Sequence, residues 1–116
     1  MQCRLQFTDK STQNKMILEV AVLNVIPEKT AEFEAGFKVA QEIISSHKGW
    51  RGHQLQKCLE APNRYILLVR WEKLEDHTIG FRESPEYLQW KKLLHHFYSP
   101  FPVVEHYVMK FDQSPI

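Results

Sequence analysis

Histidines and a few charged residues set within apolar runs are the groups in this sequence that could do acid–base chemistry. His77 follows the acidic segment 74–76 and precedes Gly80, where we expect a helix to break and to leave the mouth of a pocket. An imidazole titrates near neutral pH, so His77 is the predicted catalytic base or ligand-binding group. The alternative is a histidine that packs against its neighbours or faces solvent.

Charged and polar residues also interrupt the predicted strands. His106 lies in an alternating stretch, on the opposite face from its neighbour Glu105. Glu19 interrupts an apolar strand, and Arg70 is the only charge inside another strand, so Arg70 could pair with either carboxylate. A polar group on an apolar face needs a partner. Each of these residues therefore either makes a hydrogen bond that fixes the strand register or holds a dimer together, or lines a pocket.

Tyr98 and its neighbouring histidines form a third candidate group. Tyr98 could donate a hydrogen bond to a substrate oxygen, or it could simply pack. The adjacent His95 and His96 point about 100° apart on a helix, so they are poorly placed to chelate one ion. No cysteine or carboxylate follows at ligand spacing. We therefore predict no metal site.

The aromatic residues on the predicted helices and strands usually mean a packed core. If a cavity remains among them, it would suit a flat aromatic ligand. The predicted catalytic residues are His77, Tyr98, Arg70 and His106. The predicted substrate contacts are Glu19, His53, Trp71, Phe81, Trp90 and Phe37.

The elements that position these groups follow from hydrophobic periodicity. Strand patterns cover 17–25, 50–58, 65–71 and 101–109. Helical patterns cover 27–46, 72–80 and 85–97. The order βαββαβ predicts an α+β, ferredoxin-like fold, in which two helices cover one face of a four-stranded antiparallel sheet.

The other sheet face is also apolar in the central strands, and no helix remains to cover it. We therefore expect a homodimer that buries this face against a second copy. The domain is predicted over 16–110, between an N-terminal extension over 1–15 and a tail over 111–116. Cys3, Leu5 and Phe7 alternate with polar residues, so the extension is either a loose arm or an added edge strand.

Composition excludes several classes of protein. The net charge is +1, and no basic stripe is present, so neither nucleic acid nor an anionic membrane is an expected partner. No apolar run approaches the roughly 18 residues of a membrane span, and the first fifteen residues lack a signal core. The two cysteines fit free thiols in a reducing cytoplasm. Gly-rich phosphate loops and Ser or Cys nucleophile motifs are absent.

Several short segments resemble the antibiotic biosynthesis monooxygenase family of dimeric α/β barrels. They are the stretch 19–28, Glu32-Phe33, Gly49-Trp50, the stretch 65–72, and 74–77 followed by Ser84-Pro85. The resemblance spans about 16–107, and the polar segment 95–107 resembles an uncharacterised bacterial subgroup. It implies a cofactor-free oxygenase of a phenolic or quinol-type small molecule, with His77 as base and Tyr98, Arg70 or His106 stabilising charge.

Two other functions stay open at this point. One is a non-catalytic ligand-binding or stress-response barrel, because an apolar pocket with a few polar groups would serve it equally well. The other is haem binding or breakdown, as in one branch of the resembled family. Asn24, Trp90 and His95 have the residue types of that branch's catalytic pattern, but they are out of register with it.

Overall fold

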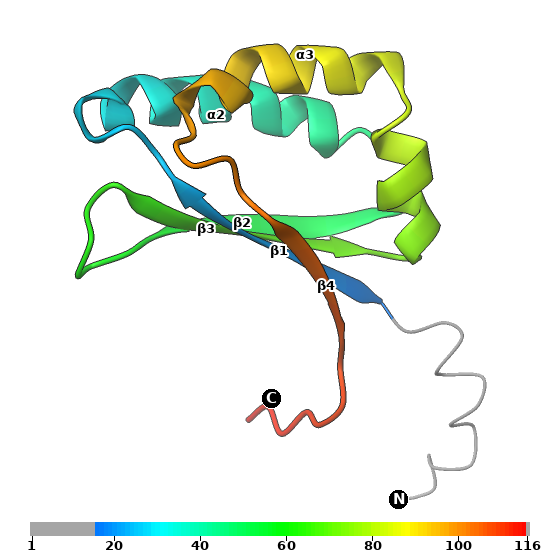
Figure 1. The fold of residues 1–116 in the computed structure, drawn as a ribbon. Coiled ribbons are helices and arrows are strands. Elements are labelled where there is room, and N and C mark those ends of the chain that lie inside the picture. The colour runs from blue at the N-terminus through cyan, green and yellow to red at the C-terminus, as the bar shows by residue number, and fades with distance from the viewer. Residues whose placement is uncertain (1–15, 116) are drawn as a thin grey trace, which may run out of the picture.

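The structure is a computed structural model that describes residues 16–115. The predicted N-terminal extension over 1–15 lies outside the described residues. In the described part, two long helices lie on one face of a four-stranded sheet (Figure 1). This two-layer arrangement confirms the predicted ferredoxin-like fold. No helix in this part of the chain is long and apolar enough to cross a membrane.

The strands and helices follow the predicted order. The strands are β1 (Ile17–Asn24), β2 (Trp50–Lys57), β3 (Arg64–Trp71) and β4 (Val104–Val108). The helical segments are η2 (Pro27–Lys29), α2 (Thr30–Ile44), η3 (Asp76–Phe81), α3 (Pro85–Leu94) and η4 (His95–Phe97). The sheet order is β2-β3-β1-β4, with antiparallel neighbours throughout. Thus β1 lies centrally, and β4 is an edge strand.

Two predicted elements are shorter than expected. The helix predicted over 27–46 opens with the 3-10 turn η2, and α2 begins only at Thr30 and ends at Ile44. The strand predicted over 101–109 is reduced to β4. Pro100 and Pro102 lack amide hydrogens, so the chain before Val104 cannot extend the ladder.

The segment η3 differs from prediction in kind. We expected a short helix that breaks at Gly80; instead the chain forms a π-helix that includes Gly80. The wider π turn buries both His77 and Phe81 against the sheet. Such segments are rare and are frequent at functional sites.

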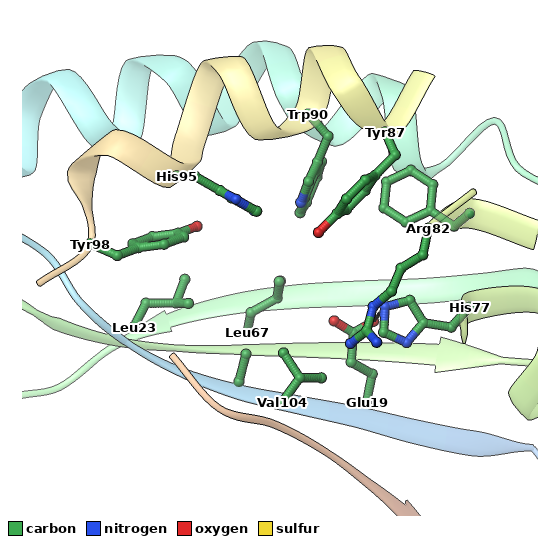
Figure 2. Close-up of a pocket in the computed structure, with 12 residues that line it drawn as sticks. Glu19, Leu23, Leu67, His77, Arg82, Tyr87, Trp90, His95, Tyr98 and Val104 are labelled. Carbon is green, nitrogen blue, oxygen red and sulfur yellow. Dashed lines mark ion pairs between the residues drawn. The ribbon is translucent and has the colours of Figure 1, made fainter. Parts of the chain in front are cut away.

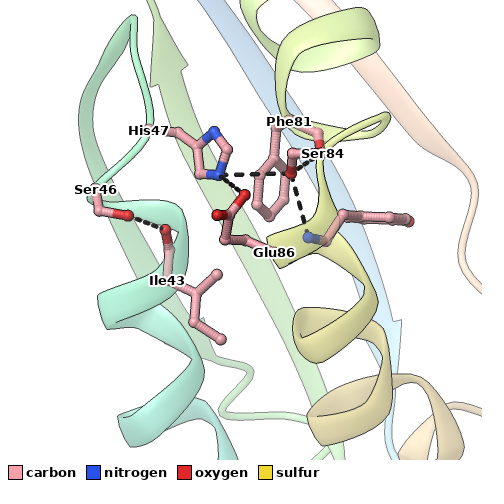
Figure 3. Close-up of polar contacts among 7 residues, drawn as sticks. Ile43, Ser46, His47, Phe81, Ser84 and Glu86 are labelled. Atoms are coloured by element: carbon pink, nitrogen blue, oxygen red, sulfur yellow. Dashed lines mark hydrogen bonds and ion pairs between the residues drawn. The ribbon is translucent and has the colours of Figure 1, made fainter.

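Hydrogen bonds join the end of η3 to the start of α3 (Figure 3). The Ser84 hydroxyl donates to the Phe81 carbonyl at 2.7 Å and accepts from the Tyr87 amide at 3.2 Å. Ser84 is thus the N-cap predicted from the sequence. His47 contacts the Ser84 hydroxyl at 3.5 Å and the Glu86 carboxylate at 3.4 Å. These contacts fix the position of η3 relative to α2 and α3.

The two sheet faces have different surroundings. The face under the helices carries buried residues of β1 and β3: Glu19, Ala21, Leu23, Tyr65, Leu67, Val69 and Trp71. The alternate residues point away from the helices: Leu18, Val20, Val22, Ile66, Leu68 and Arg70. Among the described residues, no helix lies over that second face (Figure 1). The expectation of an uncovered apolar face is therefore met.

Candidate functional site

A small cavity lies between α3 and the part of the sheet formed by β1 and β4 (Figure 2). Its free space, including the opening to solvent, is about 420 Å³, and the centre of a water-sized sphere can occupy about 50 Å³ of it. The lining residues are Glu19, Ala21, Leu23, Leu67, His77, Phe81, Arg82, Tyr87, Trp90, His95, Tyr98 and Val104. The walls combine apolar side chains with polar groups in about equal measure.

At one end, strand register brings three polar side chains together. Glu19 on β1 is paired with His106 on β4, and both lie on the face under the helices. The indole Nε1 of Trp71 donates to Glu19 Oε1 at 2.9 Å, although the two residues are far apart in sequence. A buried carboxyl group in an apolar layer requires such a partner, and the β1–β3 pairing supplies it.

His77 enters the same cluster from η3. Its Nδ1 lies 2.8 Å from His106 Nε2, and its Nε2 lies 3.5 Å from Glu19 Oε1. The imidazole stacks on the Trp71 indole, with ring centroids 5.4 Å apart and planes 14° apart. His77 therefore has a different partner on each ring nitrogen and a flat support beneath it.

Burial shifts the two acid–base groups in opposite directions, because it disfavours the charged form of each. It raises the pKa of Glu19 from 4.5 to about 7, although the Trp71 hydrogen bond and the Arg82 charge act against the change. Burial lowers the pKa of His77 from 6.5 to about 3, and electrostatic repulsion from Arg82, and from His106 whenever it is protonated, acts in the same direction. At neutral pH His77 is therefore neutral, and Glu19 is the group that titrates.

Arg82 is a site residue that we did not predict. It directly follows η3, and its guanidinium lies beside the Glu19 carboxyl group and the His77 ring (Figure 2). No carboxylate of residues 16–115 forms an ion pair with it. No sequence pattern marked it, because its position follows from the π turn, in which the Arg82 amide donates to the His77 carbonyl at 3.1 Å. Arg82 can offer a charged donor to a ligand anion.

The rest of the cavity carries uncharged polar groups, with Tyr98 and His95 at the far end and Tyr87 nearer Arg82 (Figure 2). The Tyr87 hydroxyl points into the space, as does the Tyr98 hydroxyl near the His95 ring (Figure 2). No hydrogen bond to another described residue engages these hydroxyls or that ring. Burial raises the pKa of Tyr87 and of Tyr98 and lowers that of His95. At neutral pH both tyrosines remain protonated donors, and the histidine remains neutral.

Most predicted site residues lie in or against the cavity. His77, Tyr98, Glu19, Phe81 and Trp90 line it. Two more lie directly behind this lining: Trp71 under Glu19, and His106 against His77.

Three predicted residues lie elsewhere. The expected pairing of Arg70 with Glu19 or Glu105 is wrong: Arg70 lies on the face away from the helices, opposite Leu18, and no ion pair joins it to a carboxylate of residues 16–115. His53 is held between the Trp50 indole and Gln41 at 3.0 and 2.9 Å, outside the cavity lining. Phe37 packs in the core and does not line the cavity either.

The cavity offers no obvious metal ligand set. Within residues 16–115, no group of three or more His, Cys, Asp or Glu side chains could hold a metal ion. Its donor set instead suits an organic molecule, with a charged group at one end and neutral donors at the other.

Comparisons with known proteins agree with this fold. The family model for antibiotic biosynthesis monooxygenase matches residues 16–93. The uncharacterised protein YczJ of Bacillus subtilis strain 168 is 53% identical over 92 residues, which cover 79% of this chain and 97% of YczJ.

Solved structures show the same architecture. A Bordetella bronchiseptica protein assigned to the antibiotic biosynthesis monooxygenases superposes with a TM-score of 0.80 at 35% identity, covering 84% of this chain and 99% of that one. SnoaB of Streptomyces nogalater, a cofactor-independent oxygenase, superposes with a TM-score of 0.61 at 21% identity, covering 87% and 97%. The family match, the relatives and the shared fold give one result: this chain belongs to the antibiotic biosynthesis monooxygenase family.

Proposed function

We propose that the protein is a cofactor-independent monooxygenase that acts on a single-ring phenol or quinol in the cavity under α3. One observation carries the proposal: a buried Glu19–His77 pair adjoins Arg82, which has no ion-pair partner among residues 16–115, in a small space. This combination supplies a base, a site for the resulting oxyanion and a partly enclosed pocket.

In this proposal Glu19 takes the proton from the substrate hydroxyl, and His77 orients the carboxyl group. We assign the base to this pair rather than to His77 alone, our first choice, because a histidine with a pKa of about 3 binds a proton poorly at neutral pH. The Arg82 guanidinium then stabilises the phenolate. Tyr98 and Tyr87 donate to an oxygen at the far end of the ring.

The reaction balances with dioxygen as the only oxidant. The phenolate gives electrons to O2, and one oxygen atom bonds to a ring carbon that carries hydrogen. Cleavage of the O–O bond releases the other atom as water. A hydroquinone and O2 thus give a hydroxyquinone and water, and the substrate supplies all four electrons.

Cavity size favours a small substrate. The enclosed space of about 50 Å³ is far below the roughly 300–1,000 Å³ typical of sites for drug-sized ligands, so the substrate is at most a single ring and side chains of the lining must move to admit it. The likeness to SnoaB supports cofactor-independent chemistry in this fold. The cavity supports the substrate class, through its paired polar ends.

We also propose that two copies pair through the uncovered sheet face. Val20 and Leu68 lie opposite each other at its centre, and Val22 beside them is 43% exposed in the single chain. Burying these residues against a second copy would remove apolar surface from water.

The free thiol of Cys58 in the described part fits the reducing cytoplasm expected from the sequence.

Oxygen uptake tests the activity directly. The protein would be mixed with a panel of single-ring hydroquinones under air, and oxygen consumption followed with an electrode. We expect uptake above the spontaneous rate for at least one compound, with one O2 consumed per quinol. Glu19→Gln should lower the rate about 100-fold or more, because it removes the base but keeps an acceptor for Trp71.

The control is Glu28→Gln, on the exposed surface of η2, which should keep the wild-type rate. If the protein consumes no oxygen with any compound, or if Glu19→Gln leaves the rate unchanged, the proposed function is wrong.

A further inference from the structure

Three side chains connect the buried end of the cavity to the edge of the sheet. Glu19 and His77 are 5% and 4% exposed, whereas His106 is half-buried on the edge strand β4. The contacts are successive: Glu19 Oε1 to His77 Nε2 at 3.5 Å, then His77 Nδ1 to His106 Nε2 at 2.8 Å. No hydrogen bond to a described residue engages His106 Nδ1.

Glu19, His77 and His106 can hold their protons in two arrangements. In one, Glu19 is neutral, and in the other it is ionised, so the two arrangements differ by one proton. The hydrogen bond between the two neutral imidazoles carries one hydrogen, either on His77 Nδ1 or on His106 Nε2. When Glu19 is neutral, a free lone pair on His77 Nε2 can accept its proton. When Glu19 is ionised, an N–H at His77 Nε2 faces the carboxylate. The His77–His106 hydrogen bond is already formed at 2.8 Å, and transfer from Glu19 requires that its 3.5 Å separation from His77 Nε2 shorten to hydrogen-bond length.

We propose that His77 and His106 form a proton wire that exchanges the Glu19 carboxyl proton with solvent while a ligand fills the cavity. The inference rests on the proposed function, in which Glu19 acts as the base. In the outward direction the Glu19 proton passes to His77 Nε2. The hydrogen on His77 Nδ1 passes to His106 Nε2, and the hydrogen on His106 Nδ1 leaves to water. Glu19 ends ionised, and both rings end neutral.

The surroundings leave this path as the exit when the cavity is occupied. Trp71 lies under both Glu19 and His77, and Phe81 lies against the His77 ring. A bound ligand would cover the remaining side of Glu19, which faces the cavity. Glu19 could then lose its proton to solvent only through the two histidines, because water would no longer reach the carboxyl group directly.

Charged and titratable groups face the wire from every neighbouring element. Arg82 follows η3, Tyr87 lies on α3, Tyr98 follows η4, and Glu19 itself lies on β1. The Arg82 charge, added to burial, lowers the pKa of both His77 and His106. Neither ring therefore holds a second proton for long, so each arriving proton is passed on.

The test uses 3-nitrophenol, a single-ring phenol whose yellow anion absorbs visible light. Stopped-flow mixing would follow formation of the bound anion in wild type and in His106→Gln. At about pH 6, below the Glu19 pKa of about 7, Glu19 starts mostly protonated. It must first lose this proton through the wire before it can accept the proton of the phenol. We expect the variant to form the anion about tenfold more slowly or worse, and added imidazole to restore the rate.

At about pH 8, Glu19 is already ionised, so the variant should match wild type. A purely structural role for His106 would slow both conditions alike and would not respond to imidazole. The control His96→Gln changes an exposed histidine away from the cavity. If His106→Gln does not fold, His106→Asn takes its place.

The outcomes separate this inference from the proposed function. Equal rates for wild type and the His106 variant at both pH values refute the wire, even if oxygen uptake is observed. A slow, imidazole-rescued variant without any oxygen uptake supports the wire and refutes the oxygenase. Failure of wild type to bind 3-nitrophenol as its anion counts against the wire as well.

Discussion

Glu19 and His77 share one buried environment, and it acts on them in opposite ways. A carboxyl group is neutral when protonated, whereas an imidazole is neutral when deprotonated, so burial favours the proton on Glu19 and its loss from His77. The pair is therefore mostly uncharged in the empty protein at pH values below about 7. When a bound phenol transfers its proton to Glu19, the resulting phenolate lies beside Arg82 and introduces a negative charge into the site.

The displaced pKa of Glu19 has a consequence for stability. Its folded-state pKa, about 7, lies above the ordinary value of 4.5, so the folded state binds this proton more tightly than the unfolded chain. The resulting stability is present below pH 4.5 and is lost as pH rises through 7. It corresponds to about 3 kcal/mol. His77, with a lowered pKa, contributes in the opposite sense as pH falls from 6.5 to about 3.

Glu19→Gln should remove the first contribution alone. Because glutamine does not titrate, the variant should gain about 3 kcal/mol relative to wild type between about pH 4.5 and pH 7. Urea unfolding at several pH values measures this difference, and Glu28→Gln serves as the surface control. Parallel curves for wild type and Glu19→Gln would show that Glu19 has an ordinary pKa.

Arg82→Leu should weaken binding of a ligand anion. The variant loses the guanidinium beside Glu19, so we expect about tenfold weaker binding of 3-nitrophenol as its anion. Absorbance titration gives both the affinity and the protonation state. The matched control is Arg51→Leu, because Arg51 pairs with Glu72 on the surface. Equal affinities in all three proteins would remove Arg82 from the site.

Sequence patterns identified several residues that line the cavity but missed the charged residue Arg82. Glu19, His77 and Tyr98 could be selected because each places a polar group in an apolar pattern. Arg82 could not, since its position follows from a π turn that hydrophobic periodicity does not reveal. Arg70 has the same kind of signal as Glu19, but alternation alone does not say which sheet face the helices cover.

At the scale of elements, η3 determines the site. It carries His77 and Phe81 into the cavity wall and places Arg82 next to them. Its start is held where the Asp76 carboxylate accepts from the Lys73 amide at 3.1 Å. Gly49, before β2, packs against Asp76 with φ of 87°, in a region that favours glycine.

Gly49→Ala should displace η3. The new Cβ would collide with the Asp76 carboxylate, and the backbone conformation is strained for alanine. We expect a loss of about 2 kcal/mol or more in the free energy of unfolding, with weaker 3-nitrophenol binding. Gly52→Ala is the matched control, because its φ of 124° is also strained but its Cβ meets nothing within 4 Å.

Urea unfolding and absorbance titration of both variants separate strain from collision. If Gly49→Ala and Gly52→Ala lose equal stability and both bind normally, the Gly49–Asp76 contact does not position η3.

Strand and helix order could be read from the sequence because periodicity and proline positions are local signals. The strand over β1 and the helical stripe of Phe33, Phe37, Ala40 and Ile44 are confirmed. The π-helix was missed because hydrophobic periodicity does not reveal a π turn, and β4 was predicted too long because the alternating pattern continues through Pro102 although proline cannot donate to the ladder.

At the scale of the molecule, the two sheet faces have different roles. One face holds the cavity and the other remains apolar and uncovered in the described chain (Figure 1). Leu68→Lys should therefore prevent pairing, because it places a charge at the centre of the proposed interface. Sedimentation equilibrium should give a dimer mass for wild type and a monomer mass for the variant.

Leu88→Lys is the control for this change, because Leu88 is 64% exposed on α3, away from the proposed interface. A monomeric wild type, or a Leu68→Lys variant that remains dimeric, would contradict pairing through this face. The uncovered face itself could be predicted from the sequence, since four strands and two helices leave one sheet face bare.

The most direct test of the account is the fate of isotopically labelled O2 during turnover of a single-ring hydroquinone. Mass spectrometry should find one labelled oxygen atom in the hydroxyquinone product of the wild-type protein and no such product above background with Glu19→Gln. Product that carries no label, or equal labelled product from both proteins, would contradict monooxygenation by the Glu19–His77 cavity.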